Sequence, residues 1–126
     1  MSKLLIFPMA NRPLRLYPTN MLSVVLATRN EEENLGRCLA SVIKIADEIV
    51  ITDEKSTDKT VSIAKKFGAK ILSVPHQDNF HITKNLAIAA ASGDWVLQLD
   101  ADEVVPPALA YEILRTINSK DAKDGY

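Results

Sequence analysis

Residues 23–28 read Ser23-Val24-Val25-Leu26-Ala27-Thr28, a short run of β-branched and apolar residues without amphipathic alternation. This pattern predicts a strand that is covered on both faces of a sheet. Three further apolar runs follow along the chain, at residues 48–52, 70–74 and 95–99. The sequence therefore predicts four strands at regular intervals.

Apolar residues recur at helical spacing between and after these strands. We expect Asn30 to cap a first helix and Ser56 or Thr57 to cap a second that ends at Gly68. A third helix is expected over residues 81–91 and a last one near residues 107–118. The side chains expected to face inward on these helices are Leu35, Cys38, Leu39, Val42, Ile43, Val61, Ala64, Phe67, Ile82, Leu86, Ala90, Leu109, Ile113, Leu114 and Ile117.

Strands that alternate with helices of this length imply right-handed crossovers and a parallel sheet with helices on both faces, the α/β class. With 126 residues and 47% hydrophobic residues, the chain has the size and composition of one folded domain. We expect an irregular leader over residues 1–21, one domain over residues 22–118 and a frayed tail over residues 119–126.

Charge and cysteine content narrow the function classes. A formal net charge of −1 argues against a nucleic-acid binder, which needs a dense basic face. The chain has one cysteine, so an internal disulfide is excluded and a reducing compartment is the simpler expectation. No run approaches the roughly 18 apolar residues of a membrane-spanning helix.

Polar residues follow three of the predicted strands, at residues 28–31, 53–56 and 100–103. Ligands of such sheets bind beyond the carboxyl ends of the strands, so these loops share one rim. Asp100 and Asp102 stand two residues apart, and in an extended segment both carboxylates point the same way. Two close carboxylates suit Mg²⁺ or Mn²⁺, while a solvated acidic loop that caps the next helix is the alternative.

Three motifs together resemble the family-2 glycosyltransferases. They are residues 23–31 (SVVLATRNE), residues 46–53 (ADEIVITD) with Ser56, Asp58 and Thr60, and residues 93–103 (GDWVLQLDADE). The similarity is greatest to the lipopolysaccharide-core β-glucosyltransferase-like group and covers about residues 22–118. It implies the GT-A fold, a Rossmann-like sheet that binds a nucleoside diphosphate sugar with a divalent metal, here in a truncated form.

The resemblance also implies roles for residues of this chain. Asp102 would be the direct metal ligand, and Asp100 would lie by the ribose and the metal, which is Mn²⁺ or Mg²⁺. A UDP-sugar is the favoured donor. The residues implied in nucleotide-sugar binding are Ala27, Thr28, Arg29 and Glu31 around the nucleoside, Asp53 and Glu54 at the base, Lys84 and Asn85 near the donor, and Asp100 with Ala101.

Two substitutions depart from the family pattern. Arg29 replaces an aromatic residue that often stacks near the base, and its flat guanidinium can stack in the same way. Lys55 replaces a glycine that permits a left-handed turn, so we expect a reshaped turn there.

The family's acceptor-binding half, with the acidic general base of an inverting transfer, has no counterpart in this sequence. We expect the donor-binding half of an enzyme that transfers a sugar to a glycan or lipid-linked acceptor, in cell-envelope polysaccharide biosynthesis. The alternative is a non-catalytic nucleotide-sugar-binding or interaction module. Self-association or a completing chain would follow from the missing half. The expected location is cytoplasmic, with peripheral attachment at the inner face of the membrane left open.

Other binders on similar sheets are less consistent with the sequence. A dinucleotide-binding domain needs a glycine-rich loop after the first strand, and this chain has no glycine there before Gly36. His76 and His81 flank a polar loop without a metal-ligand spacing, so we expect both to be solvated or hydrogen-bonded.

Overall fold

Four neighbouring parallel strands belong to a five-stranded sheet with the order β1-β5-β2-β3-β4. The computed structural model describes residues 4–9 and 20–119. The parallel strands are β2 (Leu22–Thr28), β3 (Glu48–Asp53), β4 (Lys70–Ser73) and β5 (Trp95–Gln98). The sequence prediction of a parallel α/β sheet is confirmed for these strands.

The fifth strand, β1 (Leu5–Pro8), lies at the edge of the sheet and pairs antiparallel with β5. The prediction of an irregular segment over residues 1–21 is therefore wrong for these four residues. Ile6 is buried in the main core and Phe7 packs against the smaller core on the opposite face, so the strand has side chains in both. Four residues carry too weak a local signal, and their pairing with residues 95–98 is a long-range contact.

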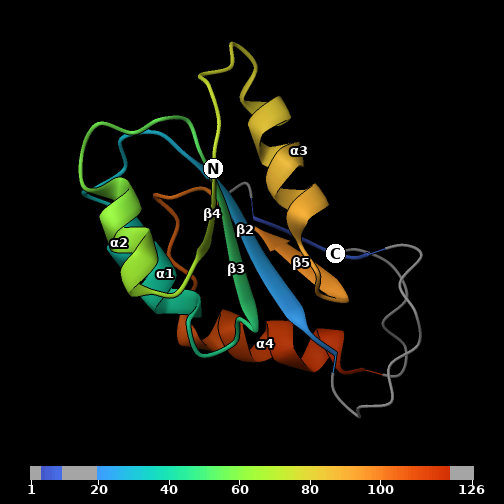
Figure 1. Cartoon of the computed structure of the whole chain (residues 1–126). Coiled ribbons are helices and arrows are strands. Elements are labelled where there is room, and N and C mark those ends of the chain that lie inside the picture. The colour runs from blue at the N-terminus through green and yellow to red at the C-terminus, as the bar shows by residue number, and fades with distance from the viewer. Residues whose placement is uncertain (1–3, 10–19, 120–126) are drawn as a thin grey trace.

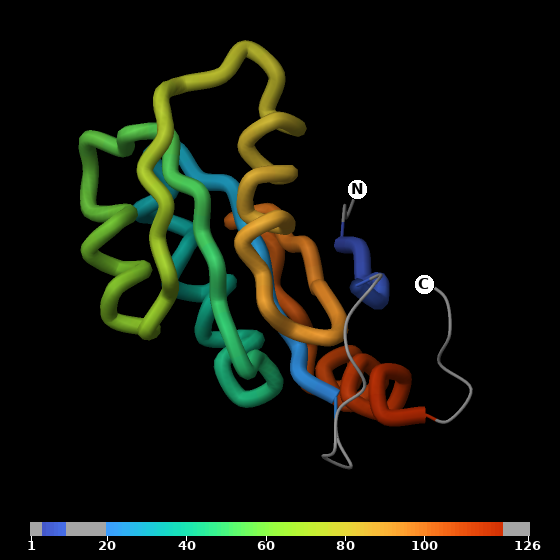
Figure 2. The backbone as a smooth tube through the Cα atoms, turned by 45° about the vertical axis from the view of Figure 1, so that its right-hand side comes forward, coloured from blue at the N-terminus to red at the C-terminus, as the bar shows by residue number. Residues whose placement is uncertain are grey.

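Helices cover the two faces unequally (Figures 1 and 2). The main core lies between one face of the sheet and α1 (Leu35–Val42), α2 (Thr60–Lys66) and α4 (Pro107–Ile117). The other face has a smaller core of Val25, Val50, Ala87, Ala91 and Val96, covered by α3 (Phe80–Ala90). None of the described helices is long and apolar enough to cross a membrane.

The helix starts differ from the sequence prediction. Asn30 does not cap α1: it adopts a left-handed backbone with φ of 51°, and its side-chain oxygen accepts a hydrogen bond from the Thr57 backbone N–H at 2.8 Å. Helix α1 instead begins at Leu35. Helix α2 begins at Thr60, whose N–H donates to the Asp58 carboxylate at 2.9 Å, so neither Ser56 nor Thr57 is its cap.

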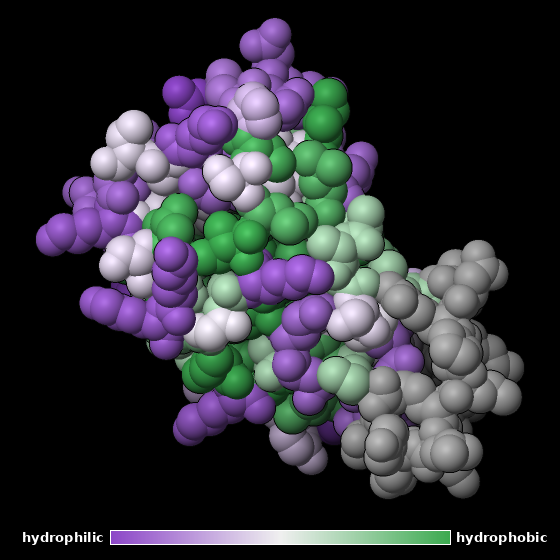
Figure 3. All heavy atoms as spheres, in the orientation of Figure 1, coloured by the Kyte–Doolittle hydropathy of each residue, from purple (hydrophilic) through white to green (hydrophobic). Residues whose placement is uncertain are grey.

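Helix α3 presents a different face to the sheet from the one predicted. Its buried residues are Thr83, Lys84 and Ala87, whereas Ile82 and Leu86 are 48% and 41% exposed. Figure 3 shows apolar side chains gathered over this helix. A buried polar anchor explains this register.

Glu54 is that anchor. Its side chain is fully buried, and it accepts hydrogen bonds from Thr83 Oγ1 at 2.5 Å and pairs with His76 Nδ1 at 2.6 Å. Burial opposes ionisation, but the hydrogen bonds from Thr83 and His76 outweigh it and hold the pKa of Glu54 below its ordinary value of 4.5. One carboxylate thus ties α3 and the segment before it to the end of β3.

We expect Glu54→Gln to destabilise the fold by about 1–3 kcal/mol at pH 7, because the neutral amide turns an N–H₂ group toward donors. The pKa of Glu54 is lowered on folding, so its stabilising effect is complete above pH 4.5 and is lost as pH falls through the lowered value. Urea unfolding at pH 7 and pH 3 should therefore show the difference from wild type shrinking in acid. Glu112→Gln, at an exposed pair with Arg115, is the matched control and should change stability little. A difference that is unchanged in acid would contradict the ionised anchor.

Gly93 packs where no side chain fits. A Cβ at this position would lie 2.6 Å from Ser23 Oγ and 2.9 Å from the Met21 carbonyl oxygen and the Ser23 nitrogen. The Gly93 N–H also donates to Ser23 Oγ at 2.8 Å, and that hydroxyl donates to Glu48 at 2.7 Å. Gly93 is thus held in close contact with β2.

Gly93→Ala should therefore cost about 1–3 kcal/mol of folding free energy, because backbone atoms of β2 must shift. Gly36→Ala in α1 is the control: its Cβ meets nothing within 4 Å, and alanine favours a helix. Denaturant unfolding should give Gly93→Ala a lower free energy of unfolding than wild type and Gly36→Ala a higher one. Equal stability of the two variants would contradict the close packing.

Candidate functional site

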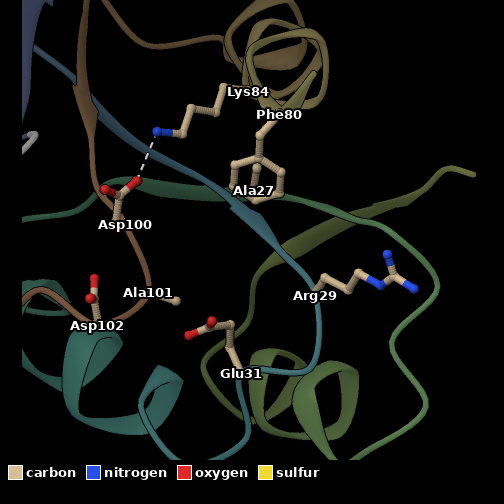
Figure 4. A pocket seen from close by; sticks show the side chains of 8 residues that line it. All are labelled: Ala27, Arg29, Glu31, Phe80, Lys84, Asp100, Ala101 and Asp102. Carbon is tan, nitrogen blue, oxygen red and sulfur yellow. Dashed lines mark ion pairs between the residues drawn. The ribbon is translucent and has the colours of Figure 1, made fainter. Parts of the chain in front are cut away.

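A cavity of about 360 Å³ opens at the carboxyl ends of β2 and β5, beside the first turns of α3. Figure 4 shows the side chains that surround it. The residues that line it are Ala27, Arg29, Glu31, Phe80, Lys84, Asp100, Ala101 and Asp102. Seven of these eight were predicted from the sequence as site residues, and Phe80 was not.

The acidic loop after β5 forms one side of the cavity. Residues 101 and 102 form a turn, so the predicted extended geometry of Asp100 and Asp102 is wrong, although both residues line the cavity. The loop is held by its own contacts: the Asp100 N–H donates to Glu103 Oε1 at 2.9 Å, and the Glu103 N–H donates to the Asp100 carbonyl oxygen at 3.0 Å. Glu103 therefore braces the loop.

The two aspartates have different surroundings. Asp100 Oδ1 forms an ion pair with Lys84 Nζ at 2.8 Å, and the Asp100 side chain is 26% exposed. Asp102 is exposed at the mouth of the cavity. Within the described ranges 4–9 and 20–119, no group of three or more His, Cys, Asp or Glu side chains is placed to hold a metal ion. A cation here would thus need ligand or water oxygens beside the two carboxylates.

The loop after β2 forms another side. Arg29 is exposed and its guanidinium extends away from the two aspartates, while the Glu31 side chain is turned toward the acidic loop (Figure 4). The Glu31 backbone N–H donates to Thr60 Oγ1 at 2.7 Å, and the Asn30 N–H donates to Ser56 Oγ at 2.8 Å. These bonds fix the loop against the segment that follows β3.

Thr28 and Asp53 lie beneath the cavity wall and do not line it. Both are buried, and Asp53 Oδ1 accepts hydrogen bonds from Thr28 Oγ1 at 2.7 Å and from Ser56 Oγ at 2.6 Å. The second oxygen, Oδ2, accepts from the Ser56 N–H at 2.9 Å. Asp53 therefore joins the two loops from below.

Lys55 retains the backbone conformation that a glycine would supply at this turn. Its φ is 50°, in the left-handed region that L side chains adopt at some cost. The sequence predicts a reshaped turn at Lys55, but the residue has the positive φ that a glycine would have there. The hydrogen bonds of Asp53 to Ser56, on either side of Lys55, hold the turn closed.

Helix α3 contributes Phe80 and Lys84. The two residues are four apart and so lie on one helix face, and Lys84 Nζ is 5.8 Å from the centroid of the Phe80 ring. This spacing is the signal by which Phe80 was predictable once Lys84 was assigned. Asn85 is exposed and does not line the cavity, because one residue further along a helix points about 100° away.

Two further predictions concern residues outside the cavity wall. Glu54, which the resemblance placed at the base, is buried beneath α3 and paired with His76. Neither residue lines the cavity. Cys38 was predicted to be a core residue, and it is fully buried. Burial and the nearby carboxylates of Glu103 and Asp102 raise the pKa of its thiol from 9.0 to about 12. A thiolate there is strongly disfavoured.

Known proteins are similar to this chain in sequence and in fold. The sequence profile described as Glycosyl transferase family 2 matches residues 23–124. A TPR repeat-containing protein of Synechococcus elongatus is 43% identical, over 75% of this chain and 27% of its own length. An uncharacterized glycosyltransferase of Rickettsia conorii is 39% identical, over 75% of this chain and 33% of its own length. The match thus spans about a quarter to a third of the length of these two relatives.

Two solved structures agree with the sequence matches. TarS of Staphylococcus aureus, residues 1–349, superimposes with a TM-score of 0.69 and 26% identity, over 78% of this chain and 32% of that one. Glucosyl-3-phosphoglycerate synthase of Mycobacterium tuberculosis, crystallised with Mn²⁺, UDP and glucosyl-3-phosphoglycerate, gives a TM-score of 0.61 and 30% identity, over 75% of this chain and 40% of that one. With the profile match over most of its length and the Rossmann-like GT-A sheet, this chain belongs to glycosyltransferase family 2.

Proposed function

We propose that this chain is the donor-binding half of an inverting glycosyltransferase, which transfers a sugar from a nucleoside diphosphate sugar to a glycan or lipid-linked acceptor. The observation that carries the proposal is the cavity itself. It brings the acidic pair Asp100 and Asp102 together with the cationic Lys84 and Arg29 at the carboxyl ends of two parallel strands. This mixture of charges suits a diphosphate accompanied by a divalent cation.

Asp102 and Asp100 are the proposed ligands of Mn²⁺ or Mg²⁺. Asp102 is exposed at the cavity mouth, and two carboxylates leave coordination positions for phosphate oxygens and water. When bound, such an ion neutralises charge on a diphosphate leaving group. Solved relatives support this choice, because the M. tuberculosis synthase was crystallised with UDP and either Mn²⁺ or Mg²⁺.

The nucleoside is proposed to lie along the loop after β2. Ala27 and Ala101 are small residues on the cavity wall, which leaves room for a ring system, and Glu31 and Arg29 add polar groups. Thr28 and Asp53 support this wall from beneath through their hydrogen bond. Phe80, from α3, adds an aromatic ring to the cavity wall (Figure 4). UDP is the favoured nucleotide.

The acceptor site and the general base are proposed to lie in a part of the enzyme other than the described residues. Two other carboxylates at this rim have other tasks: Glu103 braces the acidic loop, and Glu31 lines the donor side of the cavity. The two relatives matched by sequence are about two to three times as long as this chain and have room for a second half. We place the enzyme in the cytoplasm, in cell-envelope polysaccharide synthesis.

Asp102→Asn should weaken the Mn²⁺-dependent affinity for UDP at least about tenfold, because an amide oxygen replaces an anionic ligand of the cation. Isothermal titration of UDP with and without MnCl₂ measures this. Asp78→Asn, an exposed aspartate that does not line the cavity, is the matched control and should bind UDP as wild type does. If the Asp102 variant keeps the full manganese-dependent affinity, the proposed metal site is wrong.

Enzyme and binding module are separated by turnover. The full-length protein, incubated with Mn²⁺, a UDP-sugar and a glycan or lipid-linked acceptor, should release UDP and form a glycosylated product of inverted anomeric configuration. Mass spectrometry detects the glycosylated product, and NMR determines its anomeric configuration. Tight UDP binding with no product from a panel of sugars and acceptors would favour the non-catalytic module.

A further inference from the structure

Lys84 is a charged residue on the buried face of a helix. It is 7% exposed, while the large apolar side chains of Ile82 and Leu86 on the same helix remain 48% and 41% exposed. Burial of an ammonium group is costly unless the charge is paired. The orientation of α3 therefore leaves apolar side chains exposed and buries the stem of a cationic side chain beside the cavity.

The partner of this cation is a proposed metal ligand. Lys84 Nζ lies 2.8 Å from Asp100 Oδ1, and the two side chains are 9% and 26% exposed. Figure 4 shows the ammonium pointing from α3 to the acidic loop, whereas the other cation of the cavity wall, Arg29, points away from it. Of the cationic residues that line the cavity, Lys84 is the one that contacts this loop.

Lys84 thus competes with a divalent cation for Asp100. A divalent cation bound to Asp100 would lie beside this ammonium, and the two like charges repel each other. A free metal ion meets an acidic pair that is already half neutralised. A nucleoside diphosphate changes this balance, since its oxygens supply metal ligands and also offer Lys84 a new anionic partner.

We propose that Lys84 is a resident counter-ion that makes divalent-cation binding depend on the nucleoside diphosphate. It holds Asp100 before the ligand arrives, and its ammonium transfers to a phosphate oxygen as the metal binds Asp100. The flexible four-carbon stem of lysine permits this exchange without movement of α3, which Glu54 anchors through Thr83. The inference rests on the proposed function, because it assumes a diphosphate and a metal in this cavity.

The test uses manganese alone as the first probe. Free Mn²⁺ is measured by electron paramagnetic resonance during titration of MnCl₂ into wild type and Lys84→Met, without nucleotide. The variant should bind Mn²⁺ at least about tenfold more tightly, because the competing charge is gone. In UDP titrations at saturating Mn²⁺, the same variant should bind UDP about tenfold more weakly, because a phosphate partner is lost. A purely structural role would not move the two affinities in opposite directions.

Lys84→Arg keeps the charge and should leave the affinity for Mn²⁺ alone close to that of wild type. Lys44→Met removes an exposed lysine outside this cavity and should change neither affinity. Wild type provides a measurement that needs no folded variant: its Mn²⁺ affinity should rise at least about tenfold when UDP is present.

Three outcomes overturn the inference in distinguishable ways. If Lys84→Met gains no Mn²⁺ affinity while UDP binding still depends on Mn²⁺, the counter-ion role is wrong and the proposed function stands. If UDP binds but wild type takes up Mn²⁺ equally well with and without it, the proposed metal site is wrong as well, because UDP binding is then equally independent of Mn²⁺. If UDP does not bind at any Mn²⁺ concentration, both the proposed function and the inference are wrong.

Discussion

The last residue of β3, Asp53, and the residue that follows it, Glu54, both have buried carboxylates, and the site depends on both. Consecutive residues of a strand point to opposite faces of the sheet. Asp53 is directed to one face, where it joins the loops after β2 and β3 through Thr28 and Ser56. Glu54 is directed to the other, where it holds α3 through Thr83. The two walls of the cavity are thus fixed to one point of the backbone.

Much of the fold was predictable because its signals are local. The apolar runs that form β2, β3, β4 and β5 and the helical spacing between them are properties of short segments. β1 was missed because its four residues are stabilised by distant pairing with β5. The face of α3 was predicted wrongly for a related reason. Periodicity favours burial of Ile82 and Leu86, but hydrogen bonding to Glu54 and the ion pair with Asp100 orient Thr83 and Lys84 inward.

The location of the site was predictable from topology and from resemblance. Which residues line the cavity and which support it from beneath was not predictable. Strand-end loops meet at one rim, so Arg29, Glu31, Asp100 and Asp102 were expected together. The sequence does not distinguish a residue on the cavity wall from one directly beneath it. Thr28 and Asp53 are buried supports, and Asn85 faces away, because one residue along a strand or helix changes the direction of a side chain.

Cys38 has a practical consequence for work on this protein. It is the single cysteine of the chain, and it lies in the core under the acidic loop with a pKa of about 12. Alkylating reagents attack thiolates, so the native protein is expected to resist labelling at neutral pH. A cysteine introduced at the cavity mouth can therefore carry a fluorophore or spin label at a single position. Slow modification of Cys38 itself then reports how often the core opens.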